Sequence, residues 1–305
     1  MKNSGELEKL QKKARIRYGI MWIVAGILFV VFLAVVGIYE FRTSSDSMTV
    51  RIGVTVCAAG AIALGFIGLF YTAFVKKSYQ NFNLYFKTNY VLPILRQSGY
   101  FQDLSYSPQG GFSYGEIRDS AVVASGDARY YHSEDLLSGS YRGIRFLYGD
   151  VETKRMVVTR KRREIRTIFE GQIMRFSLLD ETKRSFGYVQ IFEKDFLFSI
   201  RGWTAQNKIQ TENKAFNQRF QVYADDPENA FSILTPPMLE QILQFADEVG
   251  EQIAITFAGS TMYVAIHRTR SMFDGYVDQP IRKQREEIDQ DIQLLCRAGD
   301  LLILS

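Results

Sequence analysis

The stretch YGIMWIVAGILFVVFLAVVGIY, Tyr18–Tyr39, contains no Asp, Glu, Lys or Arg at any of its 22 positions. A second uncharged run covers Ile52–Val75. About 20 helical residues cross a hydrocarbon layer of roughly 30 Å, and in lipid a helix satisfies all of its own peptide groups. The two runs therefore predict a transmembrane helical hairpin, in preference to two core helices of a soluble protein or a cleaved signal peptide.

Basic residues flank this hairpin on one side. Six Lys and Arg residues lie within residues 1–17, and Lys76 and Lys77 follow the second run, whereas the connecting loop balances two basic residues with two acidic ones. Lys and Arg are retained on the cytoplasmic side of a membrane. We therefore expect the amino terminus and everything after residue 76 to be cytoplasmic. Neither run contains an ionisable transport site, which argues against a transporter.

The net charge of +4 belongs to the amino-terminal tail. Residues 1–17 carry six basic and two acidic side chains, so the region after the second run is neutral overall. A neutral domain without a nucleic-acid-binding motif excludes nucleic acid as the expected partner. The lipid bilayer is the partner that the uncharged runs predict, and small side chains in the second run would also suit a homo-oligomer contact.

One charge cluster stands out within the neutral region. Between positions 154 and 166 the sequence has a single acid, Glu164, and seven basic residues: Lys154, Arg155, Arg160, Lys161, Arg162, Arg163 and Arg166. Under an anionic membrane each basic residue near the surface contributes up to about 1 kcal/mol. The cluster is either a solvated hairpin tip or a binding surface for anionic lipid headgroups or an acidic protein partner.

The cysteines and histidines predict no metal or disulfide chemistry. Cys57 and Cys296 lie on different sides of the predicted membrane, and His132 and His267 have no Cys or His at ligand spacing. Gly110 and Gly111 lack the Lys-Ser/Thr that a phosphate loop requires. No cofactor is expected.

The hydrophobic pattern after the second run predicts an α+β domain. We expect a basic tail at 1–17, the membrane hairpin at 18–75, a stalk helix at 76–99 and a cytoplasmic domain at 100–305 with a mainly antiparallel sheet and flanking helices. The pattern predicts helix over 227–250, with Pro237 near its start and Gly250 at its end, a hairpin over 253–268 and an amphipathic helix over 281–297. AFNQRFQVYADD, residues 215–226, continues the strand pattern.

Several short motifs carry a family resemblance. They are SED and SG within Ser133–Gly139, FEG at Phe169–Gly171, the stretch FNQRFQVYADDPENAFSILTP at Phe216–Pro236, and the closing strand pair. With these motifs the chain resembles the bacterial domain of unknown function 3137 family. The resemblance implies a bacterial inner-membrane protein with amino-terminal spans and a cytoplasmic domain, and it implies no catalytic residues.

Two functions follow as hypotheses. The preferred one is a membrane-anchored cytoplasmic binding or scaffold module that contacts anionic lipid or a protein partner. The alternative is a membrane-bound enzyme, for which Glu134 with Asp135 and Asp225 with Asp226 are the available acidic pairs. Neighbouring strand residues point to opposite faces, and an Asp before Pro227 suits a helix cap. The sequence therefore favours the binding module.

Overall fold

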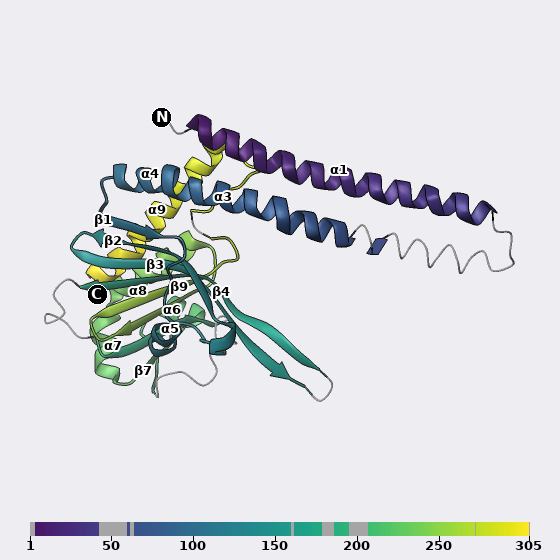
Figure 1. Ribbon diagram of the computed structural model, residues 1–305. Helices are drawn as coiled ribbons and strands as arrows, with labels where there is room; N and C mark the ends of the chain where they lie inside the picture. Colours follow the sequence, from purple (N-terminus) through teal and green to yellow (C-terminus); the bar gives the residue numbers. More distant parts are fainter. Residues whose placement is uncertain are drawn as a thin grey trace. The chain divides into compact units, whose positions relative to one another are not determined.

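The chain forms two compact units. The computed structural model describes residues 4–42, 60–61, 64–159, 162–178, 186–194, 207–271 and 273–304. The first unit comprises residues 1–90 with 275–284, and the second comprises residues 91–274 with 285–305 (Figure 1). The polypeptide thus leaves the first unit, builds most of the second, and returns to the first before its last helix.

The first unit is dominated by α1 (Ser4–Arg42), a single helix that includes the predicted basic tail and the first predicted span. Its segment Gly5–Val35 is long and apolar enough to cross a membrane, and only 11% of its most apolar window is buried. A core helix of a soluble protein would be mostly buried, whereas an amino-terminal signal sequence would pass the same test of length and composition.

The second predicted span, Ile52–Val75, lies in its first part outside the described residues, which begin at 60–61 and resume at 64. Its described part, residues 60–61 and 64–75, is helical and ends in the π-helical turn η1 (Tyr71–Val75). The helix continues as α3 (Lys76–Phe86) and then as a second π-helical turn, η2 (Lys87–Val91). Among the described residues there is therefore one complete apolar amino-terminal helix long enough to cross a membrane, where the sequence predicts two.

α1 and α3 pack against each other in antiparallel directions. Near the start of α1, the Tyr85 hydroxyl donates to Glu6 Oε2 at 2.9 Å, and farther along α1 the Arg17 guanidinium donates to Ser78 Oγ at 2.5 Å. Buried residues recur at heptad spacing on α1, at Leu7, Ala14 and Met21, as a helix–helix seam requires. The basic tail is therefore part of a packed helix pair.

A later segment of the chain, residues 275–284, completes this unit. Gly275 N donates to Asn83 Oδ1 at 2.8 Å, and Gln11 Nε2 donates to the carbonyls of Tyr276 and Gln279 at 2.9 and 2.7 Å. A Cβ on Gly275 would lie 2.8 Å from the Phe86 ring. We call residues 275–284 the strap, because it is bonded to both α1 and α3.

The second unit is built on one antiparallel sheet, with the strand order β1-β2-β3-β4-β9-β8-β5-β7-β6 in the described part of the chain. The strands are β1 (Phe101–Ser107), β2 (His132–Tyr141), β3 (Ile144–Val158), β4 (Arg163–Leu178), β5 (Tyr188–Glu193), β6 (Asn207–Ile209), β7 (Phe220–Ala224), β8 (Ile253–Ala258) and β9 (Thr261–His267). The sheet confirms the predicted α+β class, and β8 with β9 confirms the predicted hairpin.

Helices cover both faces of the sheet. α8 (Pro236–Val249) and α9 (Ile281–Leu304) lie behind the strands in Figure 1, and α5 (Tyr114–Ser120) lies in front of them. The other described helices are α4 (Leu92–Gln97), η3 (Ala128–Tyr130), α6 (Lys214–Arg219) and α7 (Pro227–Ile233). α8 begins with proline in its first turn and ends at Gly250, whose φ is +67°, as predicted.

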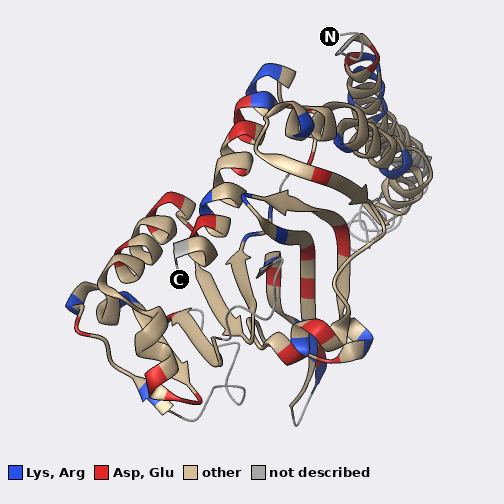
Figure 2. Cartoon of the chain, turned by 90° about the vertical axis from the view of Figure 1, so that its left-hand side faces the viewer, with Lys and Arg blue, Asp and Glu red and all other residues tan. Residues whose placement is uncertain are grey.

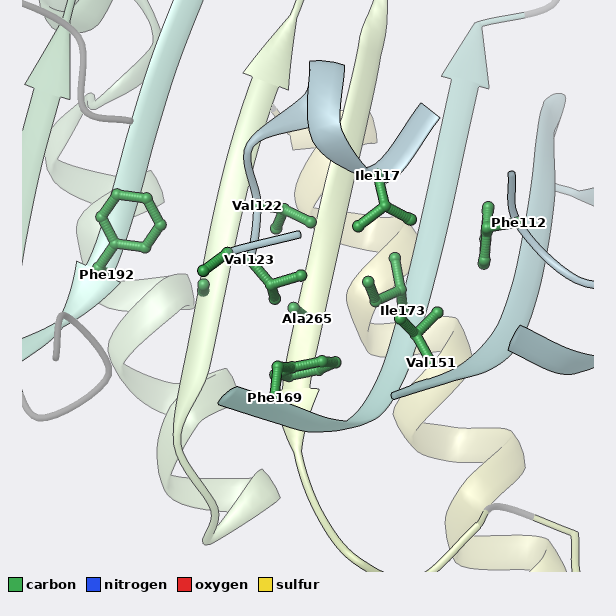
Figure 3. Packing of buried hydrophobic residues seen from close by; sticks show 11 residues of the cluster. Phe112, Ile117, Val122, Val123, Val151, Phe169, Ile173, Phe192 and Ala265 are labelled. Carbon is green, nitrogen blue, oxygen red and sulfur yellow. The ribbon is translucent and has the colours of Figure 1, made fainter. Parts of the chain in front are cut away.

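The α5 side of the sheet contains one apolar cluster. Ile117, Val122 and Val123 descend from α5 and the loop after it onto the strands, where they meet Phe169 and Ile173 of β4 (Figure 3). On the opposite face Gly299 of α9 lies against strand residues, where a Cβ would approach the Tyr141 ring at 2.9 Å. The central strands of the sheet therefore have packed residues on both faces, whereas the edge strands β1 and β6 are largely exposed.

Two features differ from the sequence-based expectation. AFNQR is helical in α6, not extended, because Asn213 caps it by accepting from Phe216 N at 3.0 Å. The stacked rings of Phe216 and Phe220 then hold the turn against the core. The edge strand β1 was not predicted either, since its Ser- and Tyr-rich sequence resembles a loop.

The FEG motif has a steric explanation. A Cβ on Gly171 would lie 2.0 Å from the carbonyl oxygen of Ile266 and 2.9 Å from Arg268 N on the neighbouring chain segment. Both are backbone atoms and cannot move aside without breaking the β4–β9 pairing, which begins at Gly171 and His267. Glycine is therefore required for the two strands to meet.

We predict that Gly171→Ala lowers the free energy of unfolding by about 2–3 kcal/mol, because overpacked sites rarely relax without cost. Thermal and urea unfolding of the full chain would measure the change. Gly115→Ala in α5 is the matched control: nothing lies within 4 Å of its Cβ position, and alanine should be neutral or stabilising by up to about 1 kcal/mol. Equal stability of the two variants would contradict the steric explanation.

Candidate functional site

The basic cluster lies on a two-stranded arm that projects beyond the sheet. β3 and β4 pair from Ile144 and Leu178 out to Val158 and Arg163. β2 stops pairing with β3 at Glu152, and β9 begins to pair with β4 only at Gly171. We call residues 153–170 the arm, and Figure 1 shows its outer part extending away from the other strands. Its strands pair with each other and have no further strand partner among the described residues.

The root of the arm is held by the segment that follows α5. Asp127 N donates to the Lys154 carbonyl and Asp127 Oδ2 accepts from Met156 N, both at 2.8 Å. Thr153 Oγ1 donates to the Ala124 carbonyl at 2.8 Å. Gly126 has a φ of +64°, and a Cβ there would lie 2.3 Å from the Lys154 carbonyl oxygen. We call Ala124–Asp127 the clamp. It fixes the base of the arm and leaves the outer residues exposed.

The tip of the arm is closed by Thr159 and Arg162. Thr159 N donates to the Arg162 carbonyl at 2.9 Å, and Arg162 N donates to Thr159 Oγ1 at 3.2 Å. Arg160 and Lys161, which the sequence places in the cluster, lie outside the described residues. The structure brings the other five cluster residues together on one arm: Lys154, Arg155, Arg162, Arg163 and Arg166.

Nearby carboxylates neutralise only some of the basic side chains of the arm. Lys154 Nζ lies 2.7 Å from Glu152 Oε1, and Arg166 Nε lies 3.2 Å from Glu164 Oε1. Arg155 is directly opposite Arg166 across the two strands, and both are exposed. Like charges at directly opposed positions destabilise a strand pair. The arm therefore keeps an arrangement that an anionic ligand would stabilise.

Large apolar side chains are exposed among these charges. Val158 is 66% exposed and Ile165 is 51% exposed. The register pairs Met156 with Ile165 and Val158 with Arg163, and two-residue periodicity places these four residues on one face of the arm. Val157 and Glu164 lie on the other face. The two-stranded arm thus exposes both basic and large apolar side chains.

The acidic pairs named by the sequence have structural roles. Asp226 caps α7 by accepting from Glu228 N at 2.9 Å, which confirms the predicted cap. Asp135 lies in a bulge of β2 with a φ of +62° and accepts a hydrogen bond from the Tyr106 hydroxyl. His132 Nε2 lies 3.5 Å from Glu134 Oε2. No group of three His, Cys, Asp or Glu residues in the described ranges could hold a metal ion.

Two tyrosines, the fully buried Tyr148 and the half-buried Tyr106, are the polar feature that sequence reasoning missed. The Tyr148 hydroxyl donates to Asp150 Oδ1 at 2.8 Å, and Tyr106 pairs with Asp135. Burial, reinforced by the neighbouring carboxylates, raises the pKa of both hydroxyls well above 10. Both tyrosines therefore stay protonated and act as hydrogen-bond donors. Tyr148 and Asp150 lie two positions apart on β3, whereas Tyr106 on β1 reaches Asp135 on β2, a partner that the sequence alone does not reveal.

The described surface also has two open hollows of about 670 Å³ each. The one beside α9 contains Arg268, Arg270 and Arg297, which pair with Asp291, Glu287 and Glu248, respectively. Figure 2 shows acidic and basic residues following one another along α9. Every arginine in this hollow already faces a carboxylate, so the hollow offers no concentrated charge to a ligand.

Fold and arm together define a class: an α+β protein with an apolar amino-terminal helix and a protruding basic hairpin. A family model described as "Protein of unknown function (DUF3137)" matches residues 167–303. This confirms the resemblance over the matched segment, which runs from within β4 into the last turn of α9. No curated protein and no solved structure matches the chain.

The matched segment separates the motifs into two groups. The FEG glycine, the Phe216–Pro236 stretch and the closing hairpin lie inside it, whereas the SED and SG motifs lie before it. The basic residues of the arm, Lys154 to Arg166, also precede it. The family match therefore supports the helix-covered sheet and does not include the basic residues of the arm.

We predict that Cys296 reacts slowly with iodoacetamide although it lines the hollow beside α9. Burial raises the pKa of its thiol to about 11, so at pH 8 the reactive thiolate is more than about a hundredfold scarcer than for an exposed cysteine. Mass spectrometry of the folded Cys57→Ser protein would follow the reaction, with urea-unfolded protein as the control. Equal rates in the two states would contradict the prediction and favour a nucleophilic thiol.

Proposed function

We propose that this protein is an integral membrane protein of the bacterial inner membrane that holds an α+β binding domain in the cytoplasm, where its basic arm contacts anionic lipid headgroups. The observation that carries the proposal is the arm itself. Five described basic residues lie together on it, and Arg155 and Arg166 are directly opposed and exposed. Two further basic residues of the sequence fall between its strands.

The membrane part of the proposal is supported by α1 and by the second uncharged run. Many large apolar side chains of α1 are exposed, among them Ile23 at 64% and Val30 at 64%, as expected for a helix whose solvent is lipid. Leu64 and Leu69, from the described part of the second run, are 70% and 73% exposed. Both runs crossing the bilayer would return the chain to the side on which it starts.

The lipid part is supported by the balance of charge. The domain is neutral as a whole, so the arm is a local concentration of positive charge. Near an anionic leaflet each Lys or Arg contributes up to about 1 kcal/mol, and the attraction is lost within a Debye length. A covalently tethered domain needs only weak contacts, because tethering raises its effective concentration. An acidic protein partner or a second copy of the chain is the alternative occupant.

We predict that the carboxyl-terminal domain is protected from protease in intact spheroplasts. The loop between the uncharged runs would be outside, while residues after 76 would be shielded by the membrane. Western blotting of a carboxyl-terminal tag, before and after permeabilisation, measures the protection, and a known periplasmic protein is the control. Digestion of the tag in intact spheroplasts would contradict the proposed orientation.

We predict that the combined variant Arg155→Gln, Arg163→Gln, Arg166→Gln weakens lipid binding at least about tenfold, because each of the three charges contributes near the surface. The full chain is placed in neutral nanodiscs and tested for co-flotation with vesicles containing about 30 mol% phosphatidylglycerol, a content that gives a strongly anionic surface. Vesicles of phosphatidylcholine alone measure charge-independent binding.

The matched control removes the same charge elsewhere. Arg129→Gln, Lys208→Gln and Lys214→Gln replace three exposed basic residues of the same unit that lie outside the arm. This control should bind anionic vesicles as the wild type does. Equal binding of wild-type protein to neutral and anionic vesicles would overturn the lipid contact, and an equal loss in both triple variants would show that net charge, not the arm, is responsible.

A further inference from the structure

We infer that the arm does more than rest on headgroups: Val158 and Ile165 insert into the interface between headgroups and acyl chains of an anionic bilayer. The inference rests on the proposed function and deepens it, since it names how the arm binds. The two side chains are 66% and 51% exposed, on an arm with no further strand partner among the described residues. A bilayer interface buries such side chains while their basic neighbours meet phosphate.

The register arranges the residues as insertion requires. Ile165 is paired with Met156, and the next pair on the same face is Val158 with Arg163. The apolar side chains thus lie near the tip of the arm, where Arg163 is paired with Val158 and Arg162 is the residue before it. Long basic side chains extend from an apolar surface and keep their charges among headgroups. The apolar residues and the charges can therefore be satisfied at the same time by one partner.

A lipid interface suits this arm better than a protein groove. Apolar residues occur on both faces, with Val157 opposite the Met156–Ile165 face. A protein partner would have to enclose the arm with an apolar groove rimmed by acidic residues. An anionic bilayer supplies a fluid apolar layer beneath a layer of negative charge and needs no matching shape. The chain also brings its own membrane helix, so a bilayer is near in every state of the protein.

The clamp provides the rigidity that insertion needs. Hydrogen bonds from Asp127 and Thr153 fix the backbone up to Met156. The apolar side chains begin where these bonds end. A fixed root lets the outer residues enter the interface without the ordering cost that a flexible loop would carry on binding.

Strand propensity is the blander explanation for these residues, because Val and Ile favour extended backbone wherever they lie. The variant Val158→Thr, Ile165→Thr separates the two explanations. Threonine keeps the branched shape and the strand propensity, and its hydroxyl replaces a methyl group of Val158 and the ethyl group of Ile165. Unfolding measurements on the full chain should show that both proteins fold equally well, because both positions are exposed.

The test uses the full-length wild type and the Thr variant, each in neutral nanodiscs. Co-flotation with phosphatidylglycerol-containing vesicles is measured in low salt and in about 0.5 M salt, at which charges are screened beyond a few ångströms. We expect wild-type binding to persist in part at high salt, and the Thr variant to lose that salt-resistant binding at least about tenfold. Phe231→Gln, which removes another exposed apolar residue on α7, should bind as the wild type does.

The outcomes separate the inference from the proposed function. Equal binding of wild type and Thr variant at both salt concentrations would overturn insertion and leave the headgroup contact standing. Absence of vesicle binding even at low salt would overturn both. Binding to immobilised polyglutamate that the Thr replacements do not change, together with absence of vesicle binding, would assign the arm to an acidic protein.

A second measurement places the side chain directly. A spin label is attached to Val158→Cys in a Cys57→Ser, Cys296→Ala background, and its accessibility to oxygen and to a water-soluble nickel complex is compared. With anionic vesicles we expect oxygen accessibility to rise and nickel accessibility to fall. The same label at Lys208→Cys, an exposed position on the edge strand β6, should remain in water. A label at position 158 that also remains in water would overturn insertion.

Discussion

The unequal length of neighbouring strands is the constraint on which the site depends. β3 and β4 stay paired, through one register shift between Thr153 and Lys154, far beyond the points where β2 and β9 end. The inner part of the ladder is covered by helices and forms the centre of the core, and the outer part has no layer to cover it. One ladder therefore serves two environments. Its sequence changes accordingly, from Phe146 and Phe176 inside to Arg155 and Arg166 outside.

The change from the covered core to the uncovered arm is abrupt, because backbone contacts fix its position on both β3 and β4. On the β4 edge, Gly171 lets the Ile266 carbonyl approach where the neighbouring strand ends. On the β3 edge, Asp127 of the clamp, which is not part of the sheet, donates a hydrogen bond to the Lys154 carbonyl and accepts one from Met156 N. Two glycines, Gly126 and Gly171, thus mark where the core stops and the arm starts. The family match includes only the second, so the sheet boundary on β4 belongs to the matched fold.

Sequence patterns predicted what depends on local periodicity. The uncharged run of α1, the amphipathic α8 with Gly250 at its end, and the alternating residues of β8 and β9 each carry their signal within a few turns or pairs. α6 was predicted as strand because its apolar residues also fit alternation, and the deciding contact is a cap from Asn213. The basic cluster was found as a charge run, but its exposure on both faces depends on where β2 and β9 end. The Tyr106–Asp135 pair joins β1 to the bulge of β2 and therefore depends on strand register, which residue types do not reveal.

The strap has a consequence for how the chain can be divided. Gly275 of the strap is hydrogen-bonded to Asn83, and two carbonyl groups of the strap accept hydrogen bonds from Gln11. Gly275 follows Asn83 by 192 residues in the chain. A shortened protein that starts after the stalk would keep these ten residues without the helices that satisfy them. The amino-terminal helices therefore could not be replaced by an unrelated membrane anchor. The strap forms its hydrogen bonds with α1 and α3 in particular.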